Sequence, residues 1–378
     1  MTVTMKPLYC SLLLATACTL SVPAFAADEQ VVKIGLTGPL TGPQAATGKD
    51  DENGARMALD YINAQGLVIA GKKTRFELMS EDDSADPRTG MSVAQRFVDA
   101  NVSAVLGPYN SGVAIPISKL LNDAQIVMAT VASNPRVTLN GYPYVFRIGN
   151  TDSQSGTRMA TFAAKNLKVK KFAVIDDRTA YGQGLADEFE KAAKANGIQI
   201  ATREYTNDKA TEFTAILTKI KGLKVDGVFY AGYHAQGGPL RKQMAQLGMD
   251  NYLLGGDGIC NEEMLKLGGK AVDDKVYCPQ GGPVLEQSNV GKTFNAAYKK
   301  RFNSEPLTYA ASMYDGLILL AKAMQKANST DPKKYKPVLA AFSYQGVAGS
   351  YAFDDKHDLK NSPISVYAFR NGQLVALN

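Results

Sequence analysis

The sequence is poor in the residues from which most active sites are built. Its 378 residues include only two histidines, His234 and His357, and four cysteines, of which two precede residue 20. The histidines and the remaining cysteines, Cys260 and Cys278, lack the spacing of metal ligands, so we expect no metal and no cofactor. The sequence also lacks a Gly-x-Ser-x-Gly motif. A binding protein is therefore favoured over an enzyme.

The motifs that bind nucleotides are also incomplete. Tyr181-Gly-Gln-Gly follows a predicted strand, but its first glycine lies too far from that strand and the third glycine of a dinucleotide motif is absent. Gly291-Lys-Thr resembles the end of a phosphate loop, yet Glu286 stands where the loop needs its first glycine. Because the basic residues are dispersed, the net charge of +6 predicts solvated faces and no nucleic-acid partner.

Apolar runs are short, and the first of them lies at the N-terminus. One cation, Lys6, precedes this run, and small residues follow it up to Ala26. This pattern predicts a secretory signal peptide over residues 1–26, cleaved after Ala26, and a periplasmic location. Cys18 leaves a lipoprotein alternative open, although Ala15 stands where that signal needs a large aliphatic residue.

Two cysteines remain in the exported chain, Cys260 and Cys278, separated by one helix-sized segment. In an oxidising compartment such a pair predicts a disulfide. Two buried free thiols are the alternative that the sequence leaves open.

Strand-like and helix-like segments alternate along most of the chain. The predicted strands are 31–36, 75–80, 103–111, 126–133, 171–177, 225–232 and 251–255, and the predicted helices are 52–62, 93–98, 185–195 and 240–247. Alternating units of this kind predict parallel sheets with helices on both faces. The length is enough for two domains, each with its own core.

Three segments interrupt this alternation: a strand that runs into polar turn residues near 144–155, and polar stretches near 278–283 and 354–363. They would suit crossings between two lobes, although ordinary surface loops remain an alternative. After the third stretch, Arg370-Asn-Gly-Gln is typical of a tight hairpin.

Two predicted strands, 103–111 and 126–133, each end on a serine, Ser111 and Ser133, that begins a helix or turn. In an open α/β sheet the binding crevice lies outside the carboxyl ends of the strands, and serines there can bind an anion. Each serine could instead cap its own helix. Two such serines in successive corners predict a site for a small anion.

A carboxylate stands at a third corner, where Asn251-Tyr-Leu-Leu-Gly-Gly-Asp257-Gly ends an apolar strand. A buried carboxylate needs a partner, and a ligand ammonium is a natural one, although a helix cap is the alternative. Serines on one side and Asp257 on the other suit an α-amino acid. Aromatic residues stand near the same corners, either in the site or as packing residues: Tyr109, Tyr181, Tyr233 and Tyr309.

Further motifs occur in order along essentially the whole exported chain: Ile34-Gly-Leu-Thr-Gly-Pro-Leu-Thr-Gly42, Gly54-Ala-Arg-Met-Ala, Ile62-Asn-Ala-Gln-Gly66, Asp82-Asp-Ser-Ala-Asp-Pro87, Tyr181-Gly-Gln-Gly and Tyr230-Ala-Gly-Tyr233-His. With them the chain resembles the periplasmic branched-chain amino-acid binding proteins, the leucine/isoleucine/valine receptors of ABC importers. The resemblance implies an α/β fold of the type I periplasmic-binding-protein class. Two Rossmann-like lobes would be joined by three hinge crossings, with a ligand cleft between them. Residues 27–151 and 281–363 would form one lobe, and residues 152–280 and 364–378 the other.

The resemblance also implies roles for individual residues. Ser111 and Ser133 would bind the ligand carboxylate, the backbone near Val131 would orient the ammonium, and Asp257 would pair with it. The expected aromatic contacts are Tyr181 and Tyr233 from the second lobe, and Tyr109 and Tyr309 around the ligand side chain.

Several positions depart from the familiar pattern. Asp257 stands where a glutamate is familiar, Thr47 where an aromatic residue is familiar, and Ser133 where a threonine is usual. The positions of a first-lobe disulfide match Ala85 and Asn110. Asn110 could favour a ligand with polar atoms or could satisfy local backbone groups, and both possibilities stay open.

The function implied by the resemblance is capture of an aliphatic L-amino acid, with leucine, isoleucine or valine expected, and its delivery to the membrane subunits of an ABC permease. A monomer without enzymatic activity is expected. Two alternatives stay open: a same-fold receptor for another small carboxylate or amide, such as an aromatic acid or a γ-amino acid, and a ligand-sensing partner of a membrane regulator.

Overall fold

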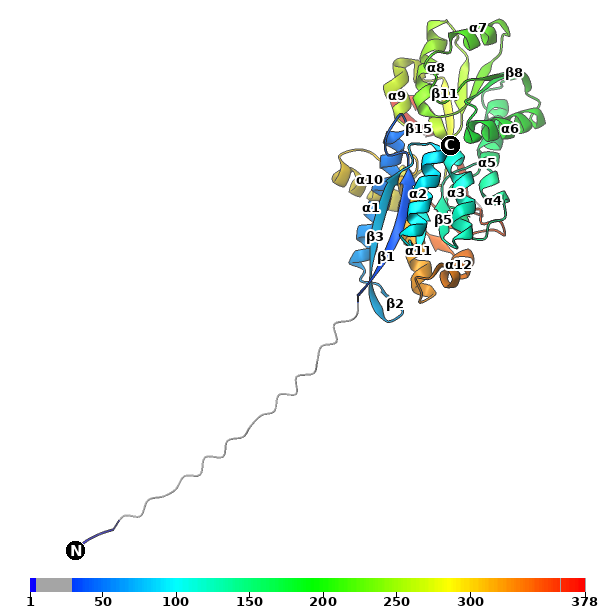
Figure 1. The fold of residues 1–378 in the computed structure, drawn as a ribbon. Helices are drawn as coiled ribbons and strands as arrows, with labels where there is room; N and C mark the ends of the chain where they lie inside the picture. Colours follow the sequence, from blue (N-terminus) through cyan, green and yellow to red (C-terminus); the bar gives the residue numbers. More distant parts are fainter. Residues whose placement is uncertain (5–28, 361, 378) are drawn as a thin grey trace.

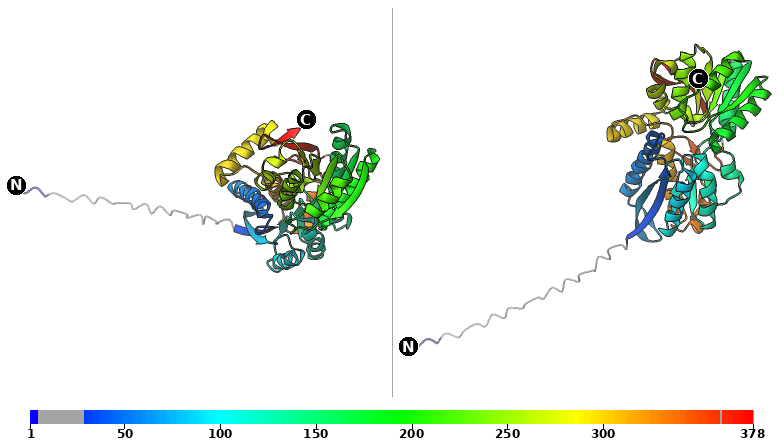
Figure 2. Two further views of the ribbon diagram at one scale, coloured as in Figure 1. Left: turned by 90° about the horizontal axis from the view of Figure 1, so that it is seen from above. Right: turned by 45° about the horizontal axis from the view of Figure 1, so that its top comes forward.

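A computed structural model describes residues 1–4, 29–360 and 362–377. From Glu29 onward, the described residues form two α/β lobes around two separate sheets (Figure 1). Figure 2 shows the two lobes one above the other, with the segments that begin the fold in one lobe and the middle of the chain in the other. Most of the predicted signal peptide, including its proposed cleavage site at Ala26, lies outside the described residues. Within the described part, no helix is both long and apolar enough to span a membrane.

The first lobe is built on a six-stranded sheet. Its strands, in spatial order, are β2 (Val68–Ile69), β3 (Lys72–Asp82), β1 (Glu29–Gly38), β4 (Ala104–Leu106), β5 (Val127–Thr130) and β6 (Val145–Arg147). All neighbouring strands are parallel except β2 and β3. The predicted alternation of strands and helices is therefore confirmed in this lobe.

Helices cover both faces of the first sheet because successive strand residues point to opposite sides. Val32, Ile34 and Leu36 of β1 pack in one core with α1 (Ala45–Ala64) and α11 (Ala310–Lys326). The opposite core contains α2 (Pro87–Asp99) and α3 (Ser111–Asp123). The lobe also contains the helices α4 (Arg136–Leu139), α10 (Asn289–Phe302) and α12 (Pro332–Ala340) and the small ladder of β12 (Tyr344–Gln345) and β13 (Ser350–Tyr351).

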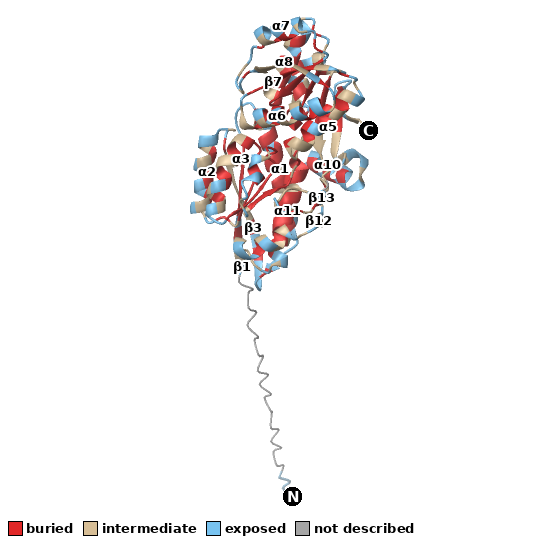
Figure 3. Cartoon of the chain, turned by 90° about the vertical axis from the view of Figure 1, so that its right-hand side faces the viewer, coloured by how far each residue is buried: buried red, intermediate tan, exposed pale blue. Residues whose placement is uncertain are grey.

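The second lobe is built on a seven-stranded sheet. Its strands, in spatial order, are β15 (Gln373–Leu377), β14 (Ile364–Arg370), β11 (Val276–Gly281), β10 (Tyr252–Gly255), β9 (Gly227–Ala231), β7 (Lys171–Asp176) and β8 (Gln199–Tyr205). The helices α5 (Asp152–Lys165) and α6 (Ala180–Ala195) pack on one face, and α7 (Thr214–Gly222), α8 (His234–Gln246) and α9 (Glu263–Gly268) on the other. Figure 3 shows the buried strands of both lobes between exposed outer helix faces.

The chain passes between the lobes three times: from β6 to α5, from β11 toward α10, and from β13 to β14. The predicted fold class is thus confirmed, whereas the exact limits of the two lobes stay a prediction. One expectation needs correction, because the polar stretch 278–283 is not wholly a connection. Residues up to Gly281 belong to β11 and pair with β14, a long-range contact that polarity alone does not indicate.

Two local predictions are also confirmed. Asn371 and Gly372, both with positive φ (52° and 71°), form the turn between the antiparallel strands β14 and β15. Cys260 and Cys278 form a disulfide with their Cα atoms 5.3 Å apart. It ties the segment that follows β10 to β11, its neighbour in the sheet.

Candidate functional site

The candidate site lies where the carboxyl ends of strands from both sheets meet. In the first sheet, β1 lies between β3 and β4, and in the second, β7 lies between β8 and β9. At such points the connections leave to opposite faces of a sheet, so that a crevice opens between them. Gly107, directly after β4, has φ +94°, and a Cβ atom there would lie 2.2 Å from the carbonyl oxygen of Thr37. Glycine at this position therefore lets the loop after β4 pack tightly against the end of β1.

Asp257 occupies the centre of this site, in a short 3₁₀ turn (Asp257–Ile259) after β10. Its carboxylate is buried, and it accepts a hydrogen bond from the Tyr181 hydroxyl (3.0 Å) and another from the Tyr309 hydroxyl (2.5 Å). Tyr181 belongs to α6 of the second lobe, whereas Tyr309 precedes α11 of the first. Burial raises the pKa of Asp257, and the two tyrosine hydrogen bonds oppose this rise. One carboxylate thus links the two lobes.

The four tyrosines predicted from the sequence form one continuous group around Asp257. The ring centroids of Tyr109 and Tyr309 are 5.9 Å apart, those of Tyr109 and Tyr233 5.7 Å, and those of Tyr181 and Tyr233 4.9 Å. All four side chains are buried. Tyr181 lies in the first turn of α6, which Thr179 caps through a hydrogen bond from the N–H of Gly182.

The two predicted serines follow the adjacent strands β4 and β5, and both are buried. The predicted strand ends need correction, because β4 ends at Leu106 and β5 at Thr130, so that a loop separates each strand from its serine. Ser111 begins α3, and its Oγ accepts a hydrogen bond from the backbone N–H of Asn134 (3.3 Å). Ser133 lies in the loop after β5, and its carbonyl accepts a hydrogen bond from the N–H of Asp152 (2.9 Å). Val131, also predicted, is buried in the same loop. The structure therefore places Ser111, Val131 and Ser133 after neighbouring strands of one sheet, while their role in binding a ligand stays a prediction.

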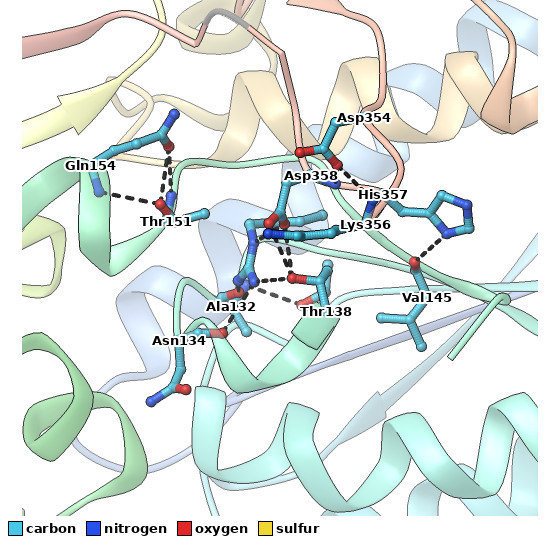
Figure 4. Close-up of polar contacts among 12 residues, drawn as sticks. Ala132, Asn134, Thr138, Val145, Thr151, Gln154, Asp354, Lys356, His357 and Asp358 are labelled. Carbon is cyan, nitrogen blue, oxygen red and sulfur yellow. Dashed lines mark hydrogen bonds and ion pairs between the residues drawn. The ribbon is translucent and has the colours of Figure 1, made fainter. Parts of the chain in front are cut away.

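A buried arginine that we did not predict holds this serine loop in place. Arg147 is 0% exposed and donates hydrogen bonds to the carbonyl groups of Ala132 and Asn134, on either side of Ser133. Figure 4 shows Ala132 and Asn134 close to Thr138 and Asp358. Arg147 also donates to Thr138 Oγ1 (2.8 Å) and forms an ion pair with Asp358 (2.7 Å). The available signal was a single arginine inside the apolar strand segment 144–149. Such a residue is rarely buried without fixed partners.

A second buried carboxylate, Asp152, was also missed. It begins α5, where Thr151 and Gln154 form a capping box, so its sequence context indicates only a helix start. Neither carboxylate oxygen accepts a hydrogen bond of good geometry from the described residues, although the Ser133 hydroxyl lies close enough to favour the ionised form. Burial and the nearby charge of Asp257 raise the pKa of Asp152 well above its ordinary value.

Polar groups also line the first-lobe side of the site. Asn110 donates a hydrogen bond from Nδ2 to Gln44 Oε1 (2.7 Å), and both side chains are buried. Thr47, one turn into α1, is 1% exposed, and its hydroxyl has no hydrogen-bond partner among the described residues. Thr47 and Asn110 are thus buried on the first-lobe side of the cleft, where Gln44 joins them.

Direct contacts hold the two lobes together around this site. Besides the Tyr309–Asp257 hydrogen bond, Asn134 Nδ2 donates to the carbonyl of Ala180 (2.7 Å) and Thr308 Oγ1 to that of Cys260 (3.1 Å). No group of three or more histidine, cysteine, aspartate or glutamate side chains in the described ranges is arranged to hold a metal ion. The donors and acceptors that converge here instead suit a small polar organic ligand.

Two α/β lobes that meet on a buried polar site define a bilobal receptor for a small molecule. The periplasmic binding protein family model matches residues 31–373, and the chain belongs to this family. It is 32% identical to the Leu/Ile/Val-binding protein BraC3 of Rhizobium johnstonii, over 91% of this chain and 93% of the relative. It is likewise 32% identical to the leucine-, isoleucine-, valine-, threonine- and alanine-binding protein of Pseudomonas aeruginosa, over 91% of each chain.

A solved structure shares the same architecture. The branched-chain amino-acid transporter substrate-binding protein LivJ of Streptococcus pneumoniae, in complex with isoleucine, superposes with a TM-score of 0.84 at 29% identity. The match covers 92% of this chain and 99% of LivJ. The resemblance identified from the ordered motifs is therefore confirmed.

Proposed function

We propose that this chain is the exported receptor of an ABC importer and that it binds an L-α-amino acid between its lobes. The observation that carries the proposal is that hydroxyl donors and a carboxylate lie on opposite sides of one buried site. Hydroxyl groups of Ser111 and Ser133 lie beyond the ends of two strands, and the carboxylate of Asp257 lies in the other lobe.

In this proposal the ligand carboxylate accepts hydrogen bonds from Ser111 and Ser133, and Arg147 holds the loop around Ser133 in place. The ligand ammonium pairs with Asp257, whose two tyrosine donors keep the carboxylate oriented. Because Asp257 and the serines belong to different lobes, a bound amino acid would be contacted from both sides. Binding would therefore favour the closed arrangement of the lobes.

The ligand class that the relatives support is aliphatic, since their names include leucine, isoleucine and valine. Delivery to permease subunits, a periplasmic location after cleavage at Ala26, and a monomeric state complete the proposal. Tyr109 and Tyr309 would contact the ligand side chain, and Tyr181 and Tyr233 would close over it from the second lobe.

Calorimetric titration of the purified exported protein against a ligand panel tests the proposal. The panel holds L-leucine, L-isoleucine, L-valine, the amine-free analogue 4-methylpentanoate, benzoate and γ-aminobutyrate. We expect binding of α-amino acids and at least about a hundredfold weaker binding of 4-methylpentanoate, because it offers Asp257 no cation. Equal binding of leucine and 4-methylpentanoate would contradict the role of Asp257. Exclusive binding of benzoate or γ-aminobutyrate would replace the ligand class.

A further inference from the structure

The turn that carries Asp257 lies beyond the end of the strand pairing in the second sheet. The pairing of β10 with β11 stops at Leu254, whereas β11 continues to Gly281. The Asp257–Ile259 turn follows β10, and the N–H of Cys260 closes it by donating a hydrogen bond to the carbonyl of Asp257 (2.9 Å). Because strand pairing no longer fixes the backbone here, the position of Asp257 depends on the contacts that the turn makes with its surroundings.

The extended part of β11 holds the end of this turn at two points. Cys278 forms the disulfide with Cys260. Gln280, two residues further along the strand, donates a hydrogen bond from Nε2 to the carbonyl of Cys260 (2.7 Å). Side chains two residues apart on a strand point to the same face of the sheet. Cys278 and Gln280 therefore hold the side chain and the backbone of the same residue.

The first lobe contacts the turn at both of its ends. Thr308 Oγ1 donates a hydrogen bond to the carbonyl of Cys260 (3.1 Å), and the hydroxyl of the next residue, Tyr309, donates one to the carboxylate of Asp257 (2.5 Å). The Cys260 carbonyl thus accepts one hydrogen bond from each lobe, which is the full capacity of a carbonyl oxygen. Cys260 and Asp257 belong to one short turn, so a displacement of Cys260 would also move the Asp257 carboxylate.

We propose that the Cys260–Cys278 disulfide and Gln280 position Asp257 for the ligand ammonium. They would thereby determine how strongly the protein prefers α-amino acids over carboxylic acids that lack the amine. The inference rests on the proposed function, in which the ligand ammonium pairs with Asp257. A buried ion pair is favourable only when its geometry is good, and the groups of a binding site must be held to within about 0.5 Å of their productive positions.

A positioning role and a purely stabilising role predict different results. A ligand without an amine forms no ion pair with Asp257, so a displaced Asp257 weakens the binding of amino acids and leaves the binding of amine-free acids unchanged. A disulfide that only stabilises the fold would change the melting temperature and leave this preference as it is. A general loosening of the contact between the lobes would weaken both kinds of ligand by the same factor.

Replacing Cys260 and Cys278 together by serine tests the role of the disulfide. Calorimetry compares L-leucine with 4-methylpentanoate, and the weaker ligand is titrated at high concentration. The dissociation constant for leucine should rise at least about tenfold, while that for 4-methylpentanoate stays within about threefold. An unchanged preference, or equal weakening of both ligands, would overturn the inference and leave the proposed function standing. Absence of any preference for leucine in the unmodified protein would overturn the proposed function itself.

Gln280→Met keeps the disulfide, so it tests the positioning role even where the serine variant does not fold. It removes one hydrogen bond from the Cys260 carbonyl, which keeps the bond from Thr308. The dissociation constant for leucine should rise roughly three- to tenfold and that for 4-methylpentanoate should stay within about twofold.

Gln30→Met is the matched control for this variant. Gln30 lies at the start of β1, away from the carboxyl ends of the strands, and donates from Nε2 to the carbonyl of Ile69 (2.9 Å) and to Thr74 Oγ1 (2.8 Å). Its substitution should leave the preference for leucine unchanged. The same preference in Gln280→Met as in Gln30→Met would exclude Gln280 as a positioning residue.

Discussion

The sharpest prediction concerns the carboxylate that joins the two lobes. Asp257→Asn keeps the size of the side chain but removes its charge, so a ligand ammonium loses its partner in a buried site. Truncating one member of a buried, hydrogen-bonded ion pair costs about 2–5 kcal/mol. We therefore expect the dissociation constant for L-leucine to rise by a factor of roughly 30 to several thousand.

Tyr309→Phe separates the ion pair from the contact between the lobes. It removes the 2.5 Å hydrogen bond to Asp257 from the first lobe but leaves the carboxylate charged and still bonded to Tyr181. A hydrogen bond to a charged group contributes about 1.5–3 kcal/mol, so the affinity should fall by a factor of roughly 10 to 100. The loss should thus be smaller than for Asp257→Asn.

Tyr335→Phe provides the matched control for this series. Tyr335 is as buried as Tyr309 and donates one hydrogen bond, to the carbonyl of Ser103 (2.7 Å), but it lies far from Asp257 in the outer core of the first lobe. Its substitution should change stability and leave ligand affinity within about twofold. The measurement is isothermal titration calorimetry at neutral pH. Asp257→Asn binding leucine within threefold of the unmodified protein would refute the ion pair on which this reasoning depends.

Three further predictions concern the supports of the site. Arg147→Lys keeps the charge but loses the planar donor set that holds the loop around Ser133. Urea denaturation should show a free energy of unfolding lower by roughly 3 kcal/mol, and calorimetry should show a weaker affinity for leucine. Unchanged affinity would argue against a positioning role. Mass spectrometry of the unreduced protein should detect no free thiol, and replacing Cys260 and Cys278 by serine should lower the free energy of unfolding by about 3 kcal/mol; a free thiol would contradict the disulfide. Burial raises the pKa of Asp177 from 3.8 to about 7, so the folded protein keeps a proton that the unfolded chain has already lost. The resulting stability is complete below about pH 4 and disappears as the pH rises through 7, so Asp177→Asn should raise the melting temperature at pH 8 and change it little at pH 4. Equal shifts at both pH values would refute this assignment.

Much of the fold could be predicted because its signals are local. Alternating strand and helix patterns, the Asn-Gly hairpin turn and the pair of exported cysteines each depend on residues close together in the sequence. The extension of β11 through Gly281 could not be predicted in this way, because its hydrogen-bond partner β14 lies more than 80 residues further along the chain.

The same distinction between local and long-range signals applies to the residues of the candidate site. Ser111, Ser133 and Asp257 could be predicted because each follows an apolar strand, and carboxyl ends of parallel strands form the crevice of an α/β sheet. Arg147 and Asp152 were missed, since one looks like a single charge in a strand and the other like the first residue of a helix. Only their burial distinguishes them from exposed charges.

The sequence by itself determined the class of the fold, the family, and the residue types available for an amino-acid ligand. The tertiary structure decided which of these side chains find partners inside the protein and which do not. Asp50 and Asp51 are neighbours in the chain and equally buried, yet Asp50 accepts hydrogen bonds from Leu307 and Ala310, whereas the carboxylate of Asp51 has no hydrogen-bond partner among the described residues. Because the partners of Asp50 lie some 250 residues away in sequence, no local pattern distinguishes this hydrogen-bonded acid from its unpaired neighbour.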